Sequence, residues 1–95
     1  MEKNVRIAAA VITVEKSSNS ITRVNNILSD FADAILARQG LSLPHHHFNI
    51  ITVILETEAN TINSFAGKIG RIPDVDIKVL MHKSFKKDEI QSTEL

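Results

Sequence analysis

The sequence predicts a single α+β domain, and three features of the 95-residue chain point to it. Segments rich in β-branched residues predict strands, and two amphipathic segments between them predict helices. The length suits one domain with one hydrophobic core. No linker divides the chain, so we expect one domain over residues 1–85 and a polar tail over residues 86–95.

The first predicted strand covers residues 5–15. Its residues are apolar on both alternations, which is typical of a strand that is buried on two faces. The polar run 16–20 follows and favours a turn with helix-capping side chains. A helical stripe then predicts an amphipathic helix. The stripe consists of Ile21, Val24, Ile27, Leu28 and Phe31.

The end of this helix has two interpretations. Periodicity alone carries it to about Gln39, because Ile35 continues the stripe and Gly40 suits the position after a helix end. In the second interpretation the helix ends near Phe31, and residues 34–43 form a strand. The residues by themselves leave both interpretations open.

The second half of the chain is clearer. Residues 44–47, Pro-His-His-His, predict a turn, and residues 48–56 give the strongest strand signal, apolar on both faces. Residues 57–60 supply capping side chains for a second amphipathic helix at residues 62–69, which the glycine that follows should stop. Residues 75–81 alternate apolar with polar, as expected of a strand with one buried face.

Composition excludes several functions. Eleven basic residues balance eleven acidic ones, so the chain offers no broad electrostatic surface for nucleic acid or an anionic membrane. The absence of cysteine removes thiolate nucleophiles, disulfides and zinc–sulfur sites, and suits a reducing compartment. No signal peptide or bilayer-spanning run occurs. We expect a cytoplasmic protein with neither a membrane partner nor direct nucleic-acid binding.

The two strands that are apolar on both faces predict self-association. Two helices cover only one face of a small sheet, and burying a Val, Leu or Ile side chain is worth about 1.5–3 kcal/mol. Leaving the other face in water would create an exposed apolar patch. We therefore expect a homodimer or homotetramer that forms through the helix-free face.

A pattern in the middle of the chain carries a family resemblance. An acidic–aromatic pair is followed by a second Asp, an apolar pair and Arg-x-Gly, and a Gly-Lys-Ile-Gly-Arg-Ile-Pro run precedes the last strand. These positions are Asp30, Phe31, Asp33, Ile35, Leu36, Arg38, Gly40 and residues 67–73. Over residues 5–82 the chain resembles the regulators of the iron-only hydrogenase system, which are short ACT-like proteins.

The resemblance implies a ferredoxin-like βαββαβ fold, with two helices on one face of a four-stranded antiparallel sheet. It places a strand at residues 34–43, in a hairpin with residues 48–56, and we prefer this to the helix. The two strands that are apolar on both faces then become the central pair. The strands with polar alternation become the edges, as edge protection requires.

The family is also similar to the effector domain of the nickel-responsive transcription regulator, which forms tetramers and holds nickel on the corresponding hairpin. The positions in this chain that correspond to the nickel ligands of that hairpin are Gly40, Ser42 and Phe48, and none of these residues can bind nickel. The resemblance therefore implies a regulatory module that binds a small effector or a protein partner, rather than a nickel-dependent repressor.

Four residues are candidates for effector binding. Ser17, Ser18 and Asn19 lie at the first strand–helix turn, which adjoins the effector pocket in ACT-like domains. Exposed helix N–H groups there suit a carboxylate or phosphate, and helix capping is the competing interpretation. Arg38, from the family pattern, is the fourth candidate.

His45, His46 and His47 support an alternative function as a metal-binding sensor, because neutral imidazoles bind nickel, zinc and copper. At most two of them share a face, and no carboxylate or cysteine lies nearby in sequence. A solvated hairpin tip that binds metal weakly is the competing interpretation. Asp30 and Asp33 have no nucleophile beside them, so we expect neither an enzyme nor a resident cofactor.

Overall fold

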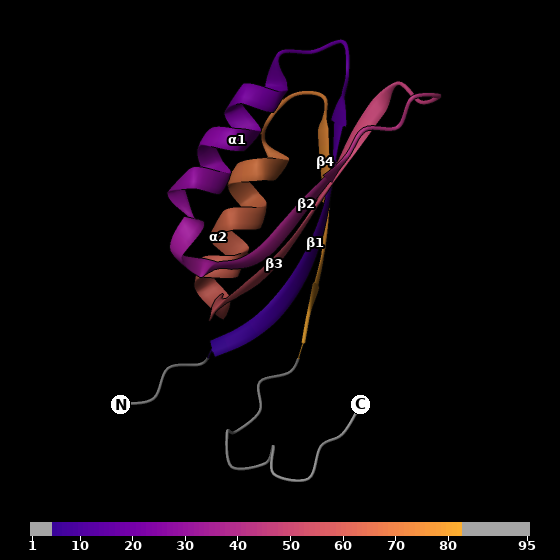
Figure 1. The fold of residues 1–95 in the computed structure, drawn as a ribbon. Coiled ribbons are helices and arrows are strands. Elements are labelled where there is room, and N and C mark those ends of the chain that lie inside the picture. Colours follow the sequence, from indigo (N-terminus) through magenta and orange to yellow (C-terminus); the bar gives the residue numbers. More distant parts are fainter. Residues whose placement is uncertain (1–4, 83–95) are drawn as a thin grey trace, which may run out of the picture.

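Strands and helices alternate in the order βαββαβ (Figure 1). The computed structural model describes residues 5–82, so the polar tail expected at residues 86–95 lies outside the described residues. The elements are β1 (Val5–Glu15), α1 (Ser20–Asp30), a 3₁₀ turn (Ala32–Ala34), β2 (Ile35–Leu41), β3 (Phe48–Glu58), α2 (Ala59–Gly70) and β4 (Val75–Met81).

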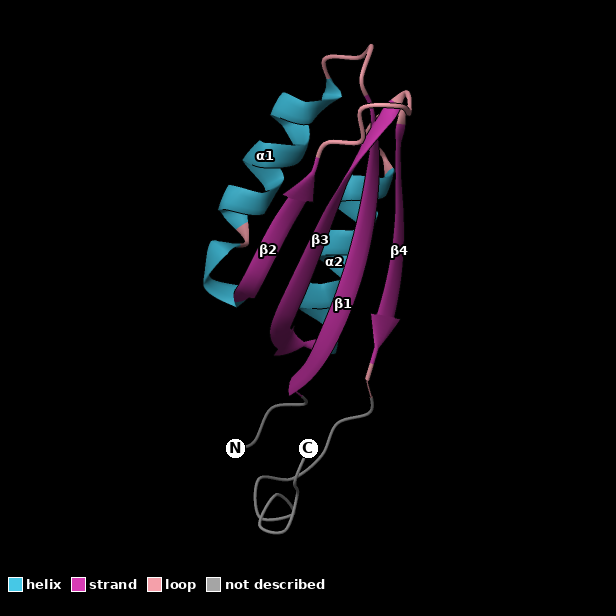
Figure 2. Cartoon of the chain, turned by 45° about the vertical axis from the view of Figure 1, so that its right-hand side comes forward, coloured by secondary structure: helices cyan, strands magenta, loops and turns pink. Residues whose placement is uncertain are grey.

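The four strands form one antiparallel sheet in the order β2-β3-β1-β4. Both helices lie on the same face of this sheet, and among residues 5–82 no second layer covers the other face (Figures 1 and 2). The ferredoxin-like fold is confirmed, with β1 and β3 as the central pair. The longest pairing runs from Val5 opposite Glu58 to Glu15 opposite Phe48.

The interpretation that carries the first helix to Gln39 is wrong. Helix α1 ends at Asp30, and the chain leaves it through the 3₁₀ turn. Phe31 packs its ring edge-on against Phe65 of α2, with 5.3 Å between the ring centroids. From Ile35 onward the backbone pairs with β3, which would otherwise present an open edge. Sheet pairing therefore overrides the helical spacing of these residues.

The core lies between the sheet and the helices. Side chains at alternate positions of β1 and β3 meet the apolar stripes of α1 and α2. The largest fully buried side chains are Phe65, Ile12, Leu28, Leu55, Ile62, Ile69, Val24 and Val53. No helix among residues 5–82 combines the length and apolar character needed to cross a membrane.

The start of α2 differs from the expectation. Residues 57–60 were expected to cap this helix, but β3 continues to Glu58 and the helix begins directly at Ala59. No side chain forms a capping hydrogen bond at Glu58, the N-cap position. Thr57 and Glu58, which were expected to cap the helix, thus belong to the sheet. At the other end of α2, Gly70 is the last helical residue, as predicted.

Candidate functional site

Three connections meet at one end of the sheet, which we call the loop end: residues 16–19 after β1, residues 42–47 between β2 and β3, and residues 71–74 before β4 (Figure 1). Backbone hydrogen bonds join them. The Lys16 N–H donates to the His47 carbonyl at 2.8 Å, and the Glu15 N–H donates to the Asp74 carbonyl at 3.1 Å. The fold therefore brings the serine turn and the histidine hairpin together, although about thirty residues of sequence separate them.

Ser20, the last residue of the polar run 16–20, fixes the start of α1. Ser20 is almost fully buried, and its hydroxyl donates to the Pro73 carbonyl at 2.6 Å. This bond ties the first residue of α1 to the loop before β4. Ser20 therefore positions the turn rather than offering a group to a ligand.

The capping interpretation of the serine turn is wrong. Asn19 occupies the N-cap position of α1, but its side chain forms no capping hydrogen bond. The Ser18 hydroxyl instead closes a local turn, since it donates to the Glu15 carbonyl and accepts from the Ser20 N–H, both at 3.2 Å. Ser17 and Asn19 are exposed, and the first turn of α1 holds no acidic residue. The first N–H group of α1 is thus bonded to the Ser18 hydroxyl and not to the side chain of the N-cap residue.

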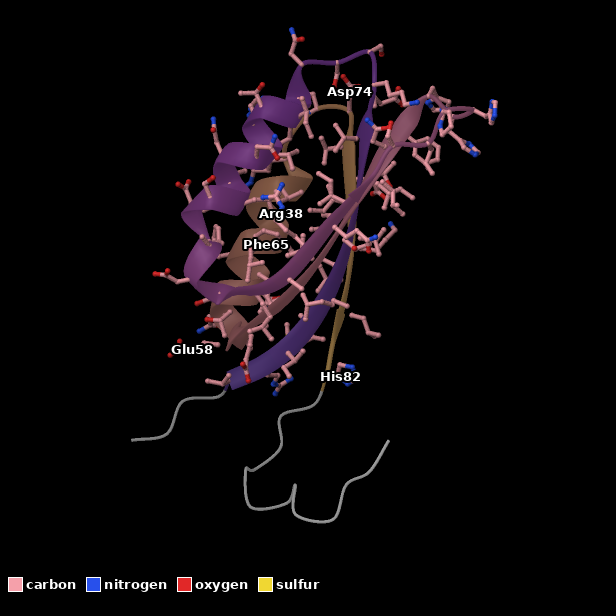
Figure 3. The ribbon with its side chains drawn as sticks, in the orientation of Figure 1. Arg38, Glu58, Phe65, Asp74 and His82 are labelled. Atoms are coloured by element: carbon pink, nitrogen blue, oxygen red, sulfur yellow. The ribbon has the colours of Figure 1, made fainter. Side chains whose placement is uncertain are left out.

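Arg38 lies away from the loop end. It lies on the edge strand β2 and pairs with Val53, five residues along β3 from Phe48, which corresponds to roughly 17 Å along the strand. Its guanidinium points to the helix side (Figure 3) and donates to the Asn25 side-chain oxygen of α1 at 3.3 Å. The structure therefore does not bring Arg38 together with Ser17, Ser18 and Asn19.

The three histidines form the exposed tip of the β2–β3 hairpin. The rings of His46 and His47 both contact Phe48, with centroid distances of 5.4 and 5.3 Å. His47 Nδ1 lies 3.5 Å from a carboxylate oxygen of Glu15, a residue that sequence spacing could not connect with the hairpin. Within residues 5–82, no group of three His, Cys, Asp or Glu side chains is placed to hold a metal ion.

The helix-free face of the sheet is the second notable surface. It consists of the residues of β1 and β3 that alternate with the core positions, together with their neighbours on the edge strands. Several large apolar side chains are exposed on it: Leu80 is 66% exposed, Leu41 45% and Val11 42%. Ile50 and Ile54 lie between them, half-buried. The only charged pair that β4 adds is Asp76 with Lys78, 3.7 Å apart.

A shallow hollow of about 330 Å³ lies at the opposite end of the molecule from the loop end. The ends of α1, β3 and α2 form it together with the 3₁₀ turn, and it includes three positions of the family pattern, Asp30, Phe31 and Asp33. Its lining comprises Asp30, Phe31, Asp33, Ala34, Glu56, Thr57 and Thr61. These residues include no His, Lys or Cys that could pair with the carboxylates as base or nucleophile.

The fold and these surfaces define the class of the protein: a small ferredoxin-like α+β domain whose described helices both cover one sheet face, with an ACT-like loop end. A family model described as "TM1266-like: Iron-only hydrogenase system regulator, putative" matches residues 6–79. The chain belongs to this family, as the pattern around Asp30 and Arg38 indicated.

A solved structure supports the same assignment. The uncharacterized protein TM1266 from Thermotoga maritima is similar to this chain with 32% sequence identity and a TM-score of 0.79. The alignment covers 83% of this chain and 99% of that one. No curated protein matches the chain.

Proposed function

We propose that this chain is a homo-oligomeric regulatory module, which packs on copies of itself through the helix-free face and binds a small anionic effector at the loop end. Membership of a regulator family supports the regulatory role. The exposure of Leu80, Leu41 and Val11 on one sheet face carries the oligomeric part of the proposal.

A second copy is the occupant that fits the helix-free face. The face is continuous over four strands and mostly apolar, as in homodimer interfaces, whose buried centres contain few charges. Its charges lie at its margins, so they belong to a polar rim: Asp76 and Lys78 are on the edge strand β4, and Glu15, Glu56 and Glu58 are near the ends of the central strands. Each buried Leu, Val or Ile contributes about 1.5–3 kcal/mol, and several such residues lie here.

Ile50→Asp tests this proposal. Ile50 lies on the helix-free face between Leu41 and Thr13, so a charge there should dissociate the oligomer and leave the fold intact. Ile21→Asp on the exposed side of α1 is the matched control and should leave the native mass unchanged. Light scattering gives the mass, and circular dichroism verifies the fold. An Ile50→Asp protein with the wild-type mass would refute the proposed interface.

The loop end supports the effector part of the proposal. Helix α1 begins there with no acidic residue in its first turn and no side-chain hydrogen bond from its N-cap residue, while its Ser20 and Thr22 N–H groups donate to the Ser18 hydroxyl and the Asn19 carbonyl. The positive end of a helix dipole attracts anions such as carboxylates and phosphates. Ser17 and Asn19 add exposed polar side chains, and Lys16 lies immediately before them. Because Arg38 lies halfway along β2, away from the loop end, and its guanidinium donates to Asn25, we place it outside this site.

A further inference from the structure

A row of apolar residues crosses the whole helix-free face. The strand registers set Ala37 of β2 beside Ile54, Ile54 beside Ala9 of β1, and Ala9 beside Leu80 of β4. Read from edge to edge, the side chains at these four positions are small, large, small and large. At the β2 edge the register shifts between Ile35 and Ala37, so the exposed Leu36 next to Ala37 has no partner of its own in β3. Such a row presents alternating hollows and projections to whatever covers it.

We infer that a second copy covers this face about a two-fold axis that runs along the strands, between β1 and β3. This inference rests on the proposed self-association and specifies its geometry. The operation exchanges β3 with β1 and β2 with β4. Ile54 then lies over Ala9 of the second copy, and Leu80 lies over its Ala37, so every large side chain of the row meets an alanine.

The polar positions agree with this axis. One row nearer the loop end, the registers align Gln39, Thr52, Val11 and Lys78 across the sheet. The same two-fold sets Lys78 over Gln39 of the second copy, so the ammonium group meets an amide and not another cation. Packed sheets rotate by about 30° relative to each other, so the match is closest for Ile54 and Ala9, the residues nearest the axis.

An axis perpendicular to the strands would lose this complementarity. It would place each strand over the same strand of the second copy, running in the opposite direction. An axis through the Thr52 row, for example, would set Ile50 over Ile54 of the second copy and Lys78 over its Lys78. Overpacked large pairs and like-charge contacts both disfavour such an interface.

A double-mutant cycle on Ala37 and Leu80 tests the inference. Within one chain the two residues lie on opposite edge strands, three strand spacings or about 14 Å apart, so their effects should add unless they meet across the interface. Ala37→Leu adds a large side chain and Leu80→Ala removes one. We expect each single change to weaken association about tenfold and the double variant to recover to within about threefold of wild type.

Analytical ultracentrifugation gives the dissociation constants, and a second cycle provides the matched control. Val11→Ala also removes apolar surface from the face, but Val11 does not lie over Ala37 in this arrangement, so Ala37→Leu and Val11→Ala should weaken association by the product of their separate effects. Multiplicative weakening by Ala37→Leu and Leu80→Ala would overturn the proposed axis and leave the oligomer standing. A wild-type chain that sediments as a monomer would instead overturn the proposed function.

Discussion

The two central strands carry apolar residues on both faces of the sheet, and the two sets of residues have very different surroundings. On the helix side, Ile12 and Leu55 are completely buried. On the other side, Val11 and Ile54, their neighbours along the same two strands, stay partly in water. The difference shows that apolar alternation reports the need for a partner and not the identity of the partner. The two helices are one partner layer, and the second copy that we propose would be the other.

The same leucine truncation on the two faces should sharpen this comparison most. Leu55→Ala on the helix side removes a side chain with no exposed surface and leaves a cavity, so we expect a loss of about 2–5 kcal/mol in the free energy of unfolding.

Leu80→Ala on the helix-free face should change subunit stability by less than about 0.5 kcal/mol, because the side chain is already exposed within one subunit. Urea denaturation at a protein concentration below the dissociation constant measures both values. Equal losses for the two variants would break the distinction between the faces.

Most of the fold could be predicted from the residues, because β1, β3 and the centres of both helices carry unambiguous periodicity. The end of α1 could not. Ile35 fits a helical stripe and a strand equally well, and only sheet pairing with Leu55 decides between them. The family resemblance supplied that answer before the structure did. The predicted N-caps of both helices were wrong because tertiary contacts set where β3 ends and where α1 begins. The hydrogen bond from Ser20 to the Pro73 carbonyl is one such contact.

The candidate site was predicted in part. The serine turn and the histidine tip were recognised as separate features, yet nothing in their spacing reveals that Lys16 bonds to His47. The proximity of Glu15 to His47 could not be predicted either, because it depends on the β1–β3 register. The hollow around Phe31 forms from the ends of three elements, and element ends are the least predictable part of a sequence.

A backbone prediction concerns Asp74, which closes the loop end next to β4. Its φ of 65° is in the left-handed region, which Asp tolerates and β-branched residues do not. Asp74→Val should lower the free energy of unfolding by about 1–2 kcal/mol.

Asp74→Gly is the matched control for this change and should be neutral or slightly stabilising. Thermal denaturation, followed by circular dichroism, compares the two variants. Equal destabilisation by valine and glycine would show that the Asp74 side chain, and not its backbone conformation, is what matters.

A smaller effect, the weak binding of an anion, is expected at the start of α1. Titration with inorganic phosphate, followed by nuclear magnetic resonance, should shift the amide signals of residues 17–21 in a saturable manner. Asn19→Asp places a carboxylate at the helix N-terminus and should abolish these shifts, because it occupies the site that an anion would take.

Asn26→Asp makes the same charge change farther along α1 and should leave the shifts in place. Arg38→Ala should also leave them in place, since Arg38 lies outside the loop end. Shifts that disappear equally in all three variants would indicate a non-specific response to charge.

The smallest effect concerns metals. One chain offers His47 and Glu15 as neighbouring ligands, whereas structural zinc sites use four. Isothermal titration with nickel and zinc should therefore show weak binding that hardly differs between wild type and a variant with His45, His46 and His47 changed to alanine. Tight binding that the triple variant loses would favour the metal-sensor alternative over the effector-binding module.

The native mass of the unmodified chain bears most directly on why β1 and β3 are apolar on both sides. Light scattering at micromolar concentration should give at least twice the mass of one chain. A mass equal to that of one chain across the accessible concentration range would contradict the account, because the exposed side chains of Leu80, Leu41 and Val11 would then need no partner.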